Sequence, residues 1–179
     1  MRSIQKPLLF VDIDGVISLF GFQPDRRPLG EWINVEGIVH LISASASGHL
    51  HRLAASYDLV WCSGWEEKAN EHLLAALVLP TALPFLTFTA QDGAPRHWKL
   101  DAIEAHAGDH ALAWIDDAHD DSCRAWASSR GAPTLLVTTD PANGLTGAHV
   151  EALEHWAARL TPAPGHPRRR PPTADAGSA

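Results

Sequence analysis

Cysteine is scarce in this chain of 179 residues, which contains only Cys62 and Cys123. Two cysteines are too few for the disulfide framework of a small secreted domain. They also do not form the C-x-x-C pair that is typical of zinc or redox sites. We therefore expect reduced thiols and a cytoplasmic protein.

Long hydrophobic runs are missing as well. The first apolar stretch covers only residues 8–11, and the residues before it lack the core and cleavage site of a signal peptide. No other apolar run reaches the length needed to cross a bilayer. The sequence therefore predicts no membrane segment.

Basic residues are in the minority, with 14 Lys and Arg against 21 Asp and Glu and a formal net charge of -7. An acidic surface is poorly suited to general nucleic-acid binding. Carboxylates gathered around a divalent cation are neutralised there, however, so the net charge does not exclude a polyanionic substrate. Hydrophobic residues make up 45% of the chain and charged residues 20%, which is typical of a folded globular protein.

The chain is long enough for one domain with a full hydrophobic core, followed by a tail. Residues 161–179 are rich in proline, alanine and arginine, and the repeated prolines oppose regular structure. We predict one domain over residues 1–160 and a disordered tail over residues 161–179. The basic run from Arg168 to Arg170 is interpreted as solvated, with a phosphate-seeking arm as the alternative.

Short apolar runs alternate with helix-like segments along the domain. Unbroken apolar runs are typical of strands buried on both faces of a parallel sheet. Such runs lie at residues 8–11, 58–62, 111–115 and 134–137, with a weaker one at 85–88. Helix-like segments lie at residues 48–55, 66–79, 100–107, 121–129 and 147–160. The alternation predicts an α/β fold: a three-layer, Rossmann-like parallel sheet with helices on both faces.

Residues 32–42 break this alternation. Two short β-like runs flank a Glu-Gly pair, which predicts a β-hairpin placed just after the first strand. We interpret this hairpin as a small flap.

Polar residues follow the predicted strands where each strand ends. Asp12 and Asp14 close the first strand in Val-Asp-Ile-Asp-Gly, and Ser63 closes the second in Trp-Cys-Ser-Gly-Trp. Lys99 stands just before a predicted helix, and Asp116 and Asp117 close a later strand. In open α/β sheets the ligand crevice lies beyond the carboxyl ends of the strands. The sequence therefore predicts that these residues share one site.

In order and spacing these residues resemble the four signature motifs of the haloacid dehalogenase (HAD) superfamily of phosphatases, from about Leu8 to Val137. The resemblance implies that Asp12 is a nucleophile that forms an aspartyl-phosphate. It implies that Asp14 protonates the leaving oxygen and then activates water. Dehalogenase members lack an acid at the second position, so Asp14 favours phosphoester chemistry.

A carboxylate can attack phosphorus only if the negative charges are screened, and Mg²⁺ suits phosphate and carboxylate oxygens. Asp12, the backbone carbonyl of Asp14, and Asp117 are the predicted metal ligands, with Asp116 and Asp121 as supporting candidates. The surplus of carboxylates leaves open which of these two assists Asp117.

The remaining candidates would hold the phosphoryl group and the substrate. Ser63 and the N–H of Gly64 would donate to the phosphoryl oxygens, and Lys99 would add a fixed positive charge. The rings of Trp65 and Trp98 could stack on a base, with core packing as the alternative.

Other aromatic and imidazole side chains are interpreted more simply. Trp61 and Trp114 lie on predicted strands and are expected in the core. The eleven histidines have no ligand pattern of a zinc site, although His119 lies within the acidic loop and could contact substrate.

The intervals that carry cap domains in this superfamily are short here. Residues 15–56 are expected to hold only the flap and one helix, and residues 70–97 one helix and a strand. A capless, open site favours a substrate that supplies its own cover, such as a polynucleotide end, a nucleotide or a protein side chain.

The Trp-x-Ser-x-Trp and Trp-Ile-Asp-Asp contexts are similar to the small capless phosphatase domains associated with RNA repair proteins, and to the phosphatase half of polynucleotide kinase-phosphatases. A kinase half is not expected, because no G-x-x-x-x-G-K-[ST] loop occurs. The sequence thus predicts a Mg²⁺-dependent phosphatase acting on a nucleic-acid end or nucleotide.

Two alternatives remain, a small-metabolite phosphatase and a non-catalytic module that binds a metal or a partner. Presence of both Asp12 and Asp14 disfavours the non-catalytic module.

Overall fold

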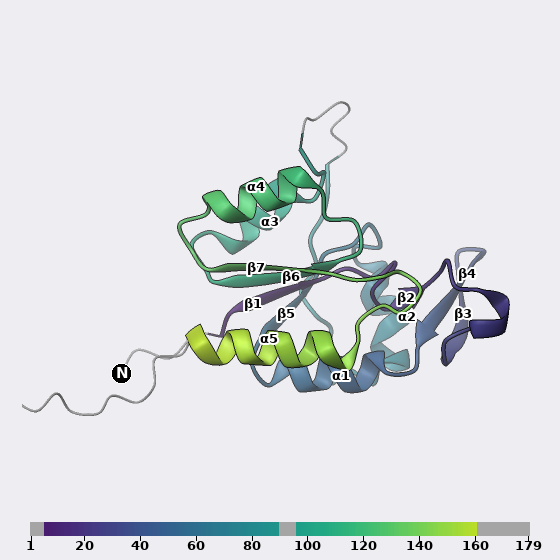
Figure 1. Ribbon diagram of the computed structural model, residues 1–179. Coiled ribbons are helices and arrows are strands. Elements are labelled where there is room, and N and C mark those ends of the chain that lie inside the picture. The colour runs from purple at the N-terminus through teal and green to yellow at the C-terminus, as the bar shows by residue number, and fades with distance from the viewer. Residues whose placement is uncertain (1–5, 90–95, 161–179) are drawn as a thin grey trace, which may run out of the picture.

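A four-stranded parallel sheet forms the centre of the computed structural model, which describes residues 6–89 and 96–160 (Figure 1). The strands are β1 (Leu8–Val11), β5 (Asp58–Trp61), β6 (Leu112–Asp116) and β7 (Thr134–Thr138), in the order β5-β1-β6-β7. All three pairings are parallel. The predicted α/β fold is therefore confirmed.

The two central strands explain why the sequence forms this sheet. Leu9, Phe10 and Val11 of β1 are fully buried, and all five residues of β6 are buried. A strand covered on both faces can be apolar at every position, because neither face meets water. Consecutive side chains then enter two different cores, one on each side of the sheet.

Helices supply those two cores (Figure 1). They are α1 (Ala46–Ala54), α2 (Lys68–Ala76), α3 (Leu100–Ala107), α4 (Asp121–Ser129) and α5 (Gly147–Leu160). Side chains from α1, α2 and α5 pack in one cluster, and those from α3 and α4 pack in the other. Tyr57 ties the first layer together, since its buried hydroxyl donates to the Leu153 carbonyl at 2.7 Å.

The predicted flap is present as a second, antiparallel sheet, in the order β2-β4-β3. Its strands are β2 (Ser18–Leu19), β3 (Gly30–Val35) and β4 (Ile38–Ser43), and a short 3-10 helix, η1 (Pro24–Arg26), precedes β3. Glu36 and Gly37 form the turn with positive φ angles of 52° and 88°. Two left-handed residues match the twist of a tight hairpin, which is why glycine suits the second position. No other inserted unit occurs among the described residues between β1 and α3, so a large cap is absent there.

The predicted strand at 85–88 is wrong. Phe85 makes only an isolated bridge to Trp61, and the neighbouring backbone is held by side chains instead. The Asn70 carboxamide bonds both backbone groups of Leu83, and the Glu66 carboxylate accepts from the Phe88 N–H. These side chains replace the partners that a strand ladder would supply.

Two predicted helices differ at their ends. The helix expected over 66–79 is Lys68–Ala76, and Glu66 and Val78 just outside it have positive φ angles of 48° and 53°. The helix expected over 48–55 is Ala46–Ala54.

The predicted tail at 161–179 lies outside the described residues. Within the described ranges, no helix combines the length and apolar character that crossing a membrane requires.

Candidate active site

The carboxyl edge of the parallel sheet brings the predicted site residues together. Val11 is in register with Trp61 on one side and with Ile115 on the other. Asp12 therefore emerges between the end of β5 and Asp116, the last residue of β6. Lys99 reaches the same place from the start of α3.

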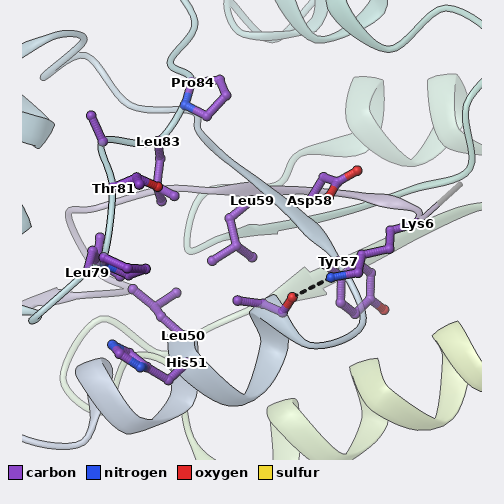
Figure 2. A pocket seen from close by; sticks show the side chains of 13 residues that line it. Lys6, Leu50, His51, Tyr57, Asp58, Leu59, Leu79, Thr81, Leu83 and Pro84 are labelled. Atoms are coloured by element: carbon purple, nitrogen blue, oxygen red, sulfur yellow. Dashed lines mark hydrogen bonds between the residues drawn. The ribbon is translucent and has the colours of Figure 1, made fainter.

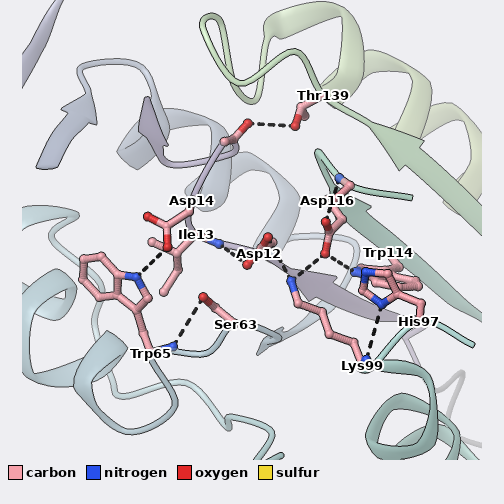
Figure 3. A network of polar contacts seen from close by, with 12 residues as sticks. Asp12, Ile13, Asp14, Ser63, Trp65, His97, Lys99, Trp114, Asp116 and Thr139 are labelled. Atoms are coloured by element: carbon pink, nitrogen blue, oxygen red, sulfur yellow. Dashed lines mark hydrogen bonds and ion pairs between the residues drawn. The ribbon is translucent and has the colours of Figure 1, made fainter. Parts of the chain in front are cut away.

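A buried ammonium group lies between two buried carboxylates (Figure 3). Lys99 Nζ is 2.9 Å from Asp12 Oδ2 and 2.6 Å from Asp116 Oδ2. The exposed fractions of Lys99, Asp12 and Asp116 are only 3%, 6% and 1%. Burial alone would lower the pKa of Lys99, but attraction to the two carboxylates raises it above its ordinary value, so the side chain stays charged.

Asp116 has its hydrogen-bonding capacity largely occupied by the protein. Besides Lys99, its Oδ2 accepts from the Trp114 indole at 3.1 Å, and its Oδ1 accepts from the Ala118 N–H at 2.9 Å. A carboxylate fixed by three donors is suited to holding Lys99 in place. Trp114, expected in the core, is fully buried there.

Asp117 packs directly against the turn that follows Asp12. A Cβ atom placed on Gly15 would lie 2.5 Å from Asp117 Cγ, and Gly15 has a φ angle of +77°. Thr139 Oγ1 donates to the Gly15 carbonyl at 2.8 Å and fixes the same turn from β7's side. Only glycine meets both demands, the left-handed backbone and the close approach.

Carboxylate oxygens of Asp12, Asp116 and Asp117 lie within 4.8 Å of one another. Three carboxylates and one ammonium give the cluster a formal charge of -2. Burial, opposed by Lys99, raises the pKa of Asp12, and burial together with Asp116 raises the pKa of Asp117. A hard divalent cation would relieve this charge, and an all-oxygen donor set fits Mg²⁺. Asp121 does not join the cluster, because its side chain is fully exposed and pairs with Arg124.

Asp14 lies at the rim of this cluster with a side chain that is 49% exposed. Its Oδ2 accepts from the Trp65 indole at 2.9 Å (Figure 3). Its Oδ1 is 3.5 Å from His40 Nδ1. No sequence motif singles out His40, because it lies in a strand, β4, whose pattern of apolar and polar residues is that of an ordinary half-buried strand. The proximity of His40 to Asp14 depends on tertiary contacts between the flap and the sheet edge.

Ser63 follows β5 and is 2% exposed, and its Oγ lies 3.5 Å from the Trp65 N–H. Gly64, next in the chain, has space around it, since a Cβ would meet only the Trp98 ring at 3.9 Å. Trp98 is 49% exposed and, with Phe88, lines a hollow of about 190 Å³.

His119 does lie near the cluster, but its ring is turned toward protein. Its Nδ1 is 2.9 Å from Thr138 Oγ1, and the ring meets Trp114 edge to face at 4.5 Å. Burial lowers the pKa of His119 to about 4, so the ring is neutral near pH 7.

A separate cavity of about 410 Å³ lies beside the other end of the sheet (Figure 2). Lys6 and Asp58, which line it, stand at the start of β1 and β5. It therefore shares no residue with the acidic cluster.

Comparison with known proteins agrees with the geometry of the sheet edge. No curated protein matches the chain significantly. Residues 8–150 match the family model described as the HAD domain in Swiss Army Knife RNA repair proteins. This match spans β1 to α5 and includes Asp12, Ser63, Lys99 and Asp117. The chain therefore belongs to the HAD superfamily, in the family of HAD domains of Swiss Army Knife RNA repair proteins.

Proposed function

We propose that the protein is a Mg²⁺-dependent phosphoric monoester hydrolase that acts through an aspartyl-phosphate on Asp12. The observation that carries the proposal is the buried Lys99 ammonium between Asp12 and Asp116, with Asp117 beside them. A structural ion pair needs one carboxylate for one ammonium. Three carboxylates around one ammonium leave negative charge that a divalent cation and its phosphate ligand would complete.

Asp12 is held on both oxygens, with Oδ1 accepting from the Ile13 N–H at 2.8 Å and Oδ2 contacting Lys99. A carboxylate fixed in this way is oriented for attack on phosphorus. In the first step an Asp12 oxygen bonds to phosphorus while the ester P–O bond breaks, and Asp14 gives its proton to the leaving oxygen. In the second step Asp14 takes a proton from the water that attacks the phosphorus, which releases phosphate and restores Asp12.

The other residues hold the reacting groups. Lys99, Ser63 and the Gly64 N–H would stabilise the charge on the transferred phosphoryl oxygens, and Asp116 keeps Lys99 in position. Mg²⁺, held by Asp12, Asp117 and the Asp14 carbonyl, would screen the repulsion between carboxylates and phosphate.

The substrate that we propose is the phosphate of a polynucleotide end or of a nucleotide. The matching family is described by its place in RNA repair proteins, which favours a phosphorylated nucleic acid as the substrate. The exposure of the Asp14 carboxyl and the absence of a large cap among the described residues between β1 and α3 leave room for a large leaving group. The exposed Trp98 ring beside Gly64 adds an apolar surface close to the proposed phosphate position.

The test compares hydrolysis of an aryl phosphate with and without Mg²⁺, with Asp12→Asn as the inactive control. Oligonucleotides with 3'- or 5'-phosphates are then compared with a panel of phosphorylated metabolites. Activity on sugar phosphates and none on oligonucleotides would replace our substrate with a small metabolite. Mg²⁺ binding without hydrolysis of any ester would favour a non-catalytic module.

A further inference from the structure

The Trp65 indole makes a polar contact that a stacking platform does not need. Its Nε1–H donates to Asp14 Oδ2 at 2.9 Å, across 51 residues of sequence. An indole N–H can only donate, so it always takes an acceptor position on that oxygen. The proton that Asp14 exchanges is therefore directed to the other oxygen, Oδ1.

The flap approaches Asp14 Oδ1 from a different direction. His40 of β4 places Nδ1 3.5 Å from Asp14 Oδ1, and the same nitrogen is 3.0 Å from Ser18 Oγ. The His40 ring also meets the Trp65 ring edge to face, with centroids 4.6 Å apart. Trp65, His40 and Ser18 thus form one connected group around a single carboxyl.

A second contact joins the flap to the segment that follows Trp65. Lys68 at the start of α2 pairs with Glu36 in the flap turn at 2.6 Å. Trp65 itself is partly buried against the core that contains α1, α2 and α5. The indole is therefore fixed by packing, whereas the Asp14 side chain, which is 49% exposed, has little packing of its own to fix it.

From this geometry we infer that Trp65 is a positioning residue for acid-base catalysis. It holds Asp14 by Oδ2, with His40 of the flap beside Oδ1, so that Oδ1 is the oxygen that exchanges a proton with the leaving group. The inference rests on the proposed phosphatase function. An acid that is free to rotate spends part of its time pointing away from the leaving oxygen, which lowers the rate of protonation without affecting the nucleophile. Trp65 contributes to the reaction only through Asp14.

The test uses leaving groups that differ in their need for a proton. In Trp65→Phe the aromatic ring remains and the donor is lost. We expect kcat/KM for an alkyl phosphate, such as the 3'-phosphate of an oligonucleotide, to fall about tenfold, the worth of one hydrogen bond to a charged acceptor. For 2,4-dinitrophenyl phosphate, whose leaving group departs without a proton, kcat/KM should change less than about twofold.

The ratio of these two constants is measured on one protein preparation, so any loss of folded protein cancels. Trp156→Phe on α5 is the matched control, because it removes an indole N–H from a ring that stacks on Tyr57 far from the sheet edge. The control should leave the ratio unchanged. Asp14→Asn should shift the ratio further than Trp65→Phe, in the same direction.

A double-mutant cycle gives an independent measure. If Trp65 acts through Asp14, Trp65→Phe should have no further effect on alkyl phosphate turnover once Asp14 is Asn. Equal losses on both leaving groups, or full additivity with Asp14→Asn, would overturn the inference while the phosphatase function stands. Absence of turnover in the wild-type protein with Mg²⁺ would instead overturn the proposed function.

Discussion

The charge of Asp12 should make the metal-free protein less stable as the pH rises. Burial, opposed by Lys99, raises the pKa of Asp12 to about 7. In the unfolded chain the same carboxyl titrates near its ordinary value of about 3.9. Between these two values the folded state holds a proton that the unfolded state has lost. The free energy of unfolding therefore falls with rising pH over this window and levels off above about pH 7.

The size of the effect follows from the width of the window. Each pH unit between the two pKa values is worth about 1.4 kcal/mol. Between pH 5 and pH 8 this amounts to about 3 kcal/mol for Asp12, most of it below pH 7. Asp12 is only 6% exposed, so solvent screening reduces the figure little.

The assay is urea unfolding in EDTA at several pH values, for the wild-type protein and for Asp12→Asn. The difference in unfolding free energy between the two proteins isolates Asp12, because other titrating groups contribute to both. An Asn amide facing Lys99 adds an offset, but this offset does not vary with pH. We expect the wild-type protein to lose about 3 kcal/mol relative to the variant between pH 5 and pH 8.

Magnesium provides the second arm of the experiment. At pH 8, Mg²⁺ at ten times its dissociation constant should raise the wild-type unfolding free energy by about 1.4 kcal/mol, with a smaller gain in Asp12→Asn. A pH-independent difference between the two proteins would refute the argument, since it would mean that Asp12 ionises in the folded protein as easily as in water.

Four further substitutions test neighbouring residues. Asp14→Asn should lower kcat by about 10² to 10⁴ while Mg²⁺ binding, measured by calorimetry, remains. Asp117→Asn should raise the Mg²⁺ concentration for half-maximal activity with little loss of metal-free stability. Asp116→Asn replaces one of two accepting oxygens by an NH2 group that faces a donor, and should cost about 1 to 3 kcal/mol in urea unfolding. Gly15→Ala should lower stability by at least about 1 kcal/mol and displace Asp117, seen as weaker Mg²⁺ binding; wild-type affinity in that variant would contradict the close packing.

The sequence alone determined the sheet and the edge on which the site lies. Unbroken apolar runs such as Leu8–Val11 are typical of strands covered on both faces, and parallel strands end at one edge. Asp12 follows one such strand and Asp116 ends another, so the sequence alone predicts that the two carboxylates lie close together. The Glu-Gly pair also predicted the turn of the flap, because glycine readily adopts the positive φ angle that a tight hairpin turn requires.

The tertiary structure decided what depends on contacts between distant segments. The apolar run at 85–88 is no strand, because it pairs with β5 only through an isolated bridge at Phe85, and side chains of Glu66 and Asn70 bond the backbone around it. The division between Asp116, which holds Lys99, and Asp117, which packs on Gly15, rests on side-chain directions at the end of β6.

The same holds for the group around Asp14. The sequence identified Trp65 only as an aromatic ring near the site. Its hydrogen bond to Asp14 joins residues that are 51 positions apart, and only the fold brings them together. His40 joins them because β4 lies beside Asp14 and Trp65 in the fold, and the spacing of residues along a strand does not predict such a contact. Local pattern thus fixed which residues gather at the edge, and packing fixed which atoms face one another.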